Sequence, residues 1–163
     1  EIADRELSTN EIKEIDGPAL KLEDAEIFCA SARFCHRAGG IWDLVPQSSN
    51  DESRKTAIKE SHDCPSGRLV IYDKKTGRPL EPEMERSIGL IEDPQVKCSG
   101  PIWVRGEIPV LSADGKVYQV RNRMTLCRCG KSTNKPFCDS SHFPEHRYEE
   151  IISRKQDHND STL

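Results

Sequence analysis

Three cysteines and one histidine lie within sixteen residues near the end of this 163-residue chain. They form a C-x-C pair and, eight residues later, a C-x3-H pair, which together comprise Cys127, Cys129, Cys138 and His142. The two ligand pairs of a zinc finger usually lie about a dozen residues apart, so the spacing is not typical of one. A C-x-C pair can place two thiolates on one iron, and Cys138 and His142 can then bind a second iron. The pattern therefore predicts a [2Fe–2S] cluster with mixed ligation, and a zinc ion held by the same residues is the alternative.

This stretch resembles the CDGSH iron–sulfur domain family, whose pattern is C-x-C-x2-S/T-x3-P-x-C-D-G-S/A/T-H. All four candidate ligands match it, and so do four neighbours that would support the metal loop, namely Ser132, Pro136, Asp139 and Ser141. One position departs from the pattern, because Ser140 stands where the family has glycine. If the backbone there needs a positive φ, serine costs about 1 kcal/mol. No ligand is changed, so we expect the cluster to survive.

A second group of cysteines lies in the first half of the chain and comprises Cys29, Cys35 and Cys64. We expect a helix over residues 30–38, which end before a Gly-Gly pair. Six residues exceed one and a half helical turns, so Cys29 and Cys35 converge only if Cys29 lies in the turn before that helix. Cys64 is followed by Pro-Ser-Gly, and ferredoxins also place proline after a cluster cysteine. Residues 24–73 resemble the divergent mono-cluster ferredoxin family, which implies a second iron–sulfur cluster.

The nuclearity of this second cluster stays open. Three thiolates are enough for a [3Fe–4S] cluster, whereas a [4Fe–4S] cluster usually takes a fourth protein ligand. The candidates for that ligand are Cys98, which lies beyond three prolines, and His36, which directly follows Cys35. The alternative is that these cysteines are buried thiols without metal.

Composition narrows the class of protein. The net charge is −4, so the chain lacks the basic footprint of a nucleic-acid-binding protein. Apolar residues make up 34% and aromatic residues 6% of the chain, which favours a small fold stabilised by metal. The seven cysteines indicate metal ligands rather than a disulfide framework, and hence a reducing compartment such as the cytoplasm. With no long apolar run and no visible signal peptide, we expect no membrane partner.

We expect an α+β fold, with a helical, ferredoxin-like first part and a small antiparallel sheet carrying the CDGSH loop. Patterning predicts a short helix or a surface segment in the first twenty residues, then a polar helix over 51–61 capped by Asn50 or Asp51 and a strand over 68–72. A proline-containing connector over 74–97 would follow, with one helical turn or a strand edge as the alternatives at 84–91. A strand over 102–106 continuing through 108–111, a turn at 113–116 and a strand over 117–120 would follow. The domains would be a lead-in at 1–23, a ferredoxin-like region at 24–95, a CDGSH-type domain at 96–148 and a polar tail at 149–163.

Function follows from the metal sites, because no nucleotide-binding loop or oriented catalytic triad is visible in the sequence. We expect a non-enzymatic protein for one-electron transfer that meets either a redox protein or an apo-acceptor protein. Cluster storage or transfer, or redox and pH sensing through the histidine ligand, is the alternative within the same class. A zinc-stapled interaction module is the alternative from a different class. The resemblance to CDGSH proteins, which often pair, leaves both a monomer and a homodimer open.

Overall fold

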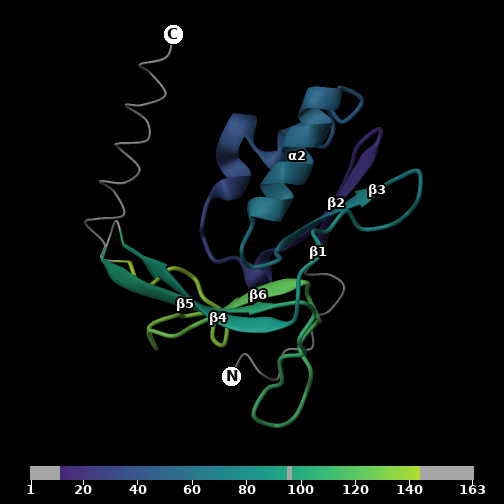
Figure 1. The fold of residues 1–163 in the computed structure, drawn as a ribbon. Coiled ribbons are helices and arrows are strands. Elements are labelled where there is room, and N and C mark those ends of the chain that lie inside the picture. The colour runs from purple at the N-terminus through teal and green to yellow at the C-terminus, as the bar shows by residue number, and fades with distance from the viewer. Residues whose placement is uncertain (1–11, 95–96, 144–163) are drawn as a thin grey trace.

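The computed structural model describes residues 12–94 and 97–143 and has an α+β fold (Figure 1). Two helices and two three-stranded antiparallel sheets make up its regular elements. The first sheet has the strand order β1-β2-β3, and the second has the order β4-β5-β6. The expected fold class is confirmed. Among the described residues, no helix is both long enough and apolar enough to cross a membrane.

The first sheet joins β1 (Ile12–Asp16), β2 (Leu20–Ala25) and β3 (Leu69–Asp73). The helix expected in the first twenty residues is wrong from Ile12 onward, and its earlier part lies outside the described residues. A short isolated helix would be marginal in water. Pairing with β2 instead satisfies the backbone groups along one edge of β1 and packs Ile15 against the core. The strand predicted at 68–72 is confirmed as β3.

The helix α2 (Asp51–Asp63) packs with the shorter α1 (Ile41–Leu44) over the first sheet (Figure 1). The side chain of Asn50 accepts hydrogen bonds from the backbone N–H groups of Glu52 and Ser53, which confirms the predicted cap. The core between helices and sheet consists of Leu20, Leu22, Ile41, Leu44, Val45, Ala57, Cys64, Leu69 and Ile71. This core fixes the end of α2, and therefore the position of Cys64.

The segment between Ala25 and α1 is irregular, so the helix expected over residues 30–38 is wrong. It contains two 3₁₀ turns, η2 (Glu26–Phe28) and η3 (Phe34–Gly39), and η3 is interrupted by non-helical backbone angles at Arg37 and Ala38. Ser31 and Arg33 both have positive φ, at 52° and 60°. A chain turning this tightly cannot form a regular helix, and it wraps around the sulfur of Cys29 instead.

The second sheet joins β4 (Ser87–Asp93), β5 (Cys98–Arg105) and β6 (Arg123–Leu126). The strand predicted at 102–106 is confirmed within β5. In the connector expected over 74–97, the strand alternative at 84–91 is the one observed, and there β4 pairs with β5 through an irregular register. The strands expected at 108–111 and 117–120 are reduced to one bridge, between Leu111 and Val117, around the predicted turn. The sheet that carries the CDGSH loop is therefore built from β4, β5 and β6.

The two halves of the chain share one interface. A second core cluster joins Ala25 and Phe28 of the first half to Val104, Met124 and Phe137 of the second. The Trp103 indole Nε1 donates to the Pro65 carbonyl at 2.8 Å. A largely buried ion pair between Arg121 and Glu23 spans the same interface, at 2.9 Å. Buried apolar and polar contacts thus hold the two cysteine groups in a fixed relation.

Candidate metal centres

The CDGSH loop begins and ends on neighbouring stretches of backbone. Leu126, the last residue of β6, forms a bridge with Phe137. The N–H of Cys127 donates to the Pro136 carbonyl at 2.8 Å, and the N–H of Cys138 donates to the Thr125 carbonyl at 3.0 Å. Ten residues separate Cys127 from Cys138 in the sequence, yet these backbone hydrogen bonds bring the two cysteines side by side.

The four predicted ligands of this loop are arranged as two pairs. The sulfurs of Cys127 and Cys129 lie 3.8 Å apart. The sulfur of Cys138 lies 3.6 Å from Nδ1 of His142. The thiols of Cys127 and Cys129 are also close enough to Cys138 to raise its pKa electrostatically, in addition to the larger effect of burial. The structure therefore brings all four residues together, with two donors on each side.

Backbone N–H groups surround these sulfurs. Lys131 donates to the Cys129 sulfur at 3.4 Å, and Ser140 donates to the Cys138 sulfur at 3.5 Å. Burial opposes ionisation of Cys127, but N–H groups of Ser132 and Gly130 directed at its sulfur hold its pKa below the ordinary value. The loop thus forms a cradle that favours thiolates.

The four supporting residues predicted from the sequence hold the loop in shape. Asp139 accepts hydrogen bonds from the backbone and hydroxyl groups of both Thr133 and Ser141. Burial would raise the pKa of Asp139, but these hydrogen bonds outweigh it and hold the pKa well below its usual range. The buried hydroxyl of Ser132 donates to the Phe137 carbonyl at 2.7 Å. Pro136 acts through its carbonyl, which accepts from Cys127.

Ser140 has the positive φ that its place in the motif suggested. Its φ is 72°, so a residue with a side chain carries a cost of about 1 kcal/mol here. Its hydroxyl donates to the carbonyl of Ala30, the residue after Cys29. The sequence flagged this position as a departure from the family pattern but gave no sign of the contact.

The three cysteines of the first half also converge. Cys29, Cys35 and Cys64 line one cavity, whose other walls are formed by residues 30–34, Pro65, Ser66 and Arg68. Cys29 follows η2 and precedes η3, as convergence requires. Burial, together with the neighbouring sulfurs of Cys64 and Cys29, raises the pKa of Cys35 to about 11. This mutual repulsion between thiolates is what a bound cation would relieve.

Neither candidate for a fourth ligand lines this cavity. Cys98 lies at the start of β5, and the ring of His36 packs on Trp42 with centroids 5.0 Å apart. The cavity wall midway between Cys29 and Cys35 is occupied by Ala32. In the ferredoxin motif C-x2-C-x2-C this middle position is a cysteine. The described part of the cavity therefore offers three thiolates.

Sequence reasoning missed Arg68. Its guanidinium binds both carboxylate oxygens of Asp24, and its Nη1 lies 3.0 Å from the Cys29 sulfur. Asp24 is almost fully buried and also accepts from the Trp42 indole at 2.9 Å. Burying a charged side chain without a partner is unfavourable. An arginine directly between Cys-Pro-Ser-Gly and an apolar strand could therefore have indicated a buried, paired cation.

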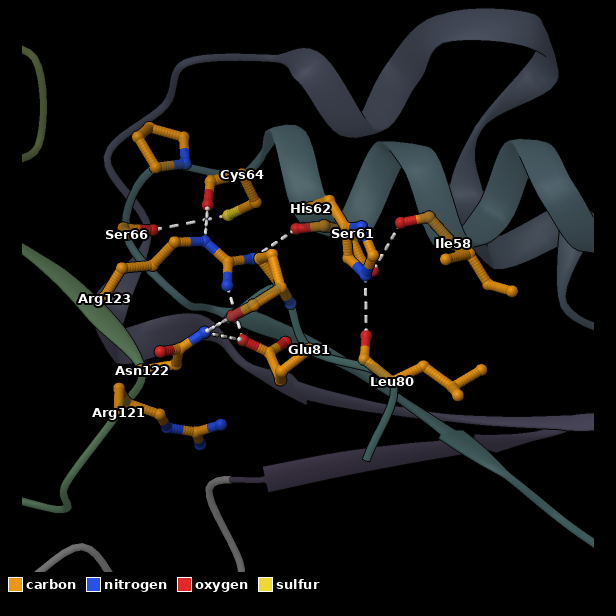
Figure 2. Close-up of polar contacts among 12 residues, drawn as sticks. Ile58, Ser61, His62, Cys64, Ser66, Leu80, Glu81, Arg121, Asn122 and Arg123 are labelled. Carbon is orange, nitrogen blue, oxygen red and sulfur yellow. Dashed lines mark hydrogen bonds and ion pairs between the residues drawn. The ribbon is translucent and has the colours of Figure 1, made fainter. Parts of the chain in front are cut away.

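Arg123 was also missed, and its role is visible in Figure 2. This arginine of β6 is fully buried and donates to the carbonyls of Ser61 and Cys64 and to the carboxylate of Glu81. A cation thereby caps the end of α2 where Cys64 emerges. Nearby, Gly67 has a φ of 65°, and a Cβ there would lie 2.3 Å from the Arg123 carbonyl, so this close approach requires glycine.

The donor sets fit iron–sulfur clusters better than single ions. No disulfide links the cysteines in the described residues. Within the same ranges, no three Cys, His, Asp or Glu side chains gather closely enough to hold one metal ion. A cluster, in contrast, spreads its ligands over several irons. Paired donors in the CDGSH loop and three thiolates around a cavity both match that requirement.

Comparison with known proteins agrees with this chemistry. Residues 99–143 match the family described as iron-binding zinc finger CDGSH type, and residues 15–74 match the family described as divergent 4Fe-4S mono-cluster. No curated protein and no solved structure matches the chain. Both resemblances seen in the sequence are confirmed. A segment similar to the divergent mono-cluster family therefore precedes a segment similar to the CDGSH-type iron-binding family, and both matches support an iron–sulfur protein.

Proposed function

We propose that this protein carries single electrons between redox partners through two iron–sulfur clusters. Cys127, Cys129, Cys138 and His142 would hold a [2Fe–2S] cluster, and Cys29, Cys35 and Cys64 would hold the second. The observation that carries the proposal is the direct packing of the two ligand loops. The ring of Phe28 meets the ring of Phe137 edge-on at 4.9 Å, and the Asn134 amide donates to the Ile27 carbonyl at 2.6 Å. Two redox centres placed this close suit a relay.

The arrangement of the CDGSH ligands supports a two-iron cluster over zinc. One pair of donors is two cysteines and the other is a cysteine with a histidine, so each pair can serve one iron. Such a cluster supplies a site that gains or loses one electron. The N–H groups directed at the sulfurs stabilise negative charge there, which raises the reduction potential.

For the second cluster we propose [3Fe–4S]. Three thiolates line the cavity, and Ala32 occupies the place of a further ligand. Arg68, which also lines the cavity, holds Cys29 in place by its hydrogen bond to the sulfur. Both sites use their cysteines and histidine as ligands, so we propose electron transfer rather than enzymatic catalysis. A redox protein in a reducing compartment such as the cytoplasm would be the partner.

Replacing one ligand tests the proposal. His142→Cys would exchange a neutral imidazole for a thiolate and should lower the potential of the [2Fe–2S] cluster by on the order of 100 mV or more. An EPR-monitored redox titration measures it, and the second cluster serves as the internal control, with an unchanged potential. An unaltered [2Fe–2S] potential, or a colourless protein containing zinc, would contradict the assignment.

Cluster transfer is a second candidate, and the exposure of Cys129 favours it. A ligand sulfur at the surface can be reached by the thiols of an apo-acceptor protein. Incubating the loaded protein with an apo-ferredoxin separates the two functions. Reversible reduction without loss of iron supports electron transfer, whereas movement of iron and sulfide to the acceptor supports cluster transfer.

A further inference from the structure

Ser140 lies between the two proposed cluster sites and contacts both. Its backbone N–H donates to the Cys138 sulfur at 3.5 Å. Its hydroxyl donates to the carbonyl of Ala30, the residue that is joined directly to Cys29 through its backbone nitrogen. A glycine, which the CDGSH pattern has here, could make the first contact but not the second.

The backbone conformation at Ser140 is unfavourable for a residue with a side chain. Ser140 has a φ of 72°, in the region that favours glycine. Residues with side chains persist in such conformations when the surrounding structure compensates, and they gather at functional sites. At Ser140 the compensating contact is the hydrogen bond to Ala30, which is formed across the interface between the two halves of the chain.

The contact between the Ser140 hydroxyl and the Ala30 carbonyl is partly buried. Ala30 and Cys138 are both buried, and the Phe28–Phe137 pair lies beside them. Cys29 is fixed from the other side, where Arg68 and the N–H of Ser31 donate to its sulfur. The bonded route therefore runs from the Cys138 sulfur through Ser140 and Ala30 to the Cys29 sulfur, with hydrogen bonds at two steps.

We propose that Ser140 is a positioning residue that couples the two clusters, so that one electron passes between them within the molecule. This inference rests on the proposed function. An external one-electron donor reduces one cluster, and the electron then moves to the other. The first cluster is reoxidised by one electron and the second is reduced by one, and no covalent bond forms or breaks.

Two substitutions separate the effect of the Ser140 hydroxyl from the effect of the strained backbone conformation. Ser140→Ala removes the hydroxyl and keeps the strain, whereas Ser140→Gly removes both and restores the residue typical of the motif. Both variants should fold and retain the visible and EPR spectra of both clusters. In both, the intramolecular electron exchange that follows rapid photoreduction by a light-activated donor should be several-fold slower, as followed by absorbance.

Asn134→Ala is the matched control, because it removes another hydrogen bond between the same loops without lying on the route between the sulfurs. Its exchange rate should stay near that of the wild type. An unchanged rate in both Ser140 variants, or an equal slowing in Asn134→Ala, would overturn the role of Ser140. If the wild-type protein itself showed no iron–sulfur spectra, the proposed function would be rejected instead. Failure of the proposed function is therefore distinguishable from failure of the role of Ser140.

Discussion

Arg68 shows how one side chain can set the properties of a metal site. It places a positive charge and a hydrogen-bond donor on the Cys29 sulfur while its remaining nitrogens bind the buried Asp24. A reduced cluster is more negative than an oxidised one, so this cation favours the reduced state. The planar fork of arginine is required to contact both partners at once.

Arg68→Lys should therefore lower the potential of the second cluster by on the order of 50 mV and leave the [2Fe–2S] potential unchanged. Lysine keeps the charge beside Asp24, so we expect a loss of only about 1–3 kcal/mol in the free energy of unfolding. Redox titration followed by EPR measures both potentials. Arg54→Lys, at a more exposed ion pair with Asp73, is the control. Equal potentials in Arg68→Lys and the wild type would refute the role of Arg68.

At the scale of elements, α2 is the part that delivers a ligand. Asn50 caps its beginning, and Arg123 from the second sheet binds the carbonyls at its end. Along the helix, Glu60 lies one turn before Cys64 and is 2% exposed, and neither of its carboxylate oxygens has a hydrogen-bond partner. The stability of α2 therefore depends on the contacts at its two ends and on the protonation of Glu60.

Arg123→Met should destabilise the protein by about 3–5 kcal/mol, because Glu81 loses the cation to which it is paired. The carbonyl of Cys64 also loses its donor, so the second cluster should be lost before the [2Fe–2S] cluster on warming. Thermal scans at wavelengths that report each cluster test this order. The exposed Arg86→Met should behave like the wild type. Simultaneous loss of both clusters in Arg123→Met would argue against a specific link to Cys64.

Glu60 predicts a pH dependence of stability. Burial is the main cause that raises its pKa to about 7, and nearby Asp63 adds to it while Arg37 opposes it. The folded state therefore binds this proton more tightly than the unfolded state. Its stabilising effect is complete below the unfolded pKa near 4.5 and is lost as pH rises through about 7.

Glu60→Gln removes this titration, so its stability relative to the wild type should rise between about pH 5 and pH 8, by roughly 2–3 kcal/mol. Unfolding midpoints of both proteins across this range measure the difference. Glu52→Gln, which replaces an exposed carboxyl at the start of the same helix, is the matched control and is measured across the same range. A difference between Glu60→Gln and the wild type that stays constant with pH would mean that Glu60 does not titrate in this range.

At the scale of the whole molecule, local pattern predicted the parts and missed their contacts. The spacing of the cysteines and histidine, the capped helix at Asp51 and the fold class were all readable, because each depends on residues close in sequence. The strand at Ile12–Asp16 and the full extent of the strand at Ser87–Asp93 were not, because each is set by pairing with the next strand of its sheet. The burial of Arg123 was not either, because its partners Cys64 and Ser61 lie 59 and 62 positions away in the chain. The contact between Ser140 and Ala30 joins residues 110 positions apart and belongs to the same class.

The most direct test of a two-cluster protein is the content of iron and acid-labile sulfide per chain, measured on anaerobically purified protein together with EPR before and after dithionite. We predict about five irons, an EPR signal from the oxidised [3Fe–4S] cluster and a new signal from the [2Fe–2S] cluster on reduction. About six irons with an EPR-silent oxidised state would replace [3Fe–4S] by [4Fe–4S] at Cys29, Cys35 and Cys64. About two irons per chain, or zinc alone, would contradict the two-cluster account.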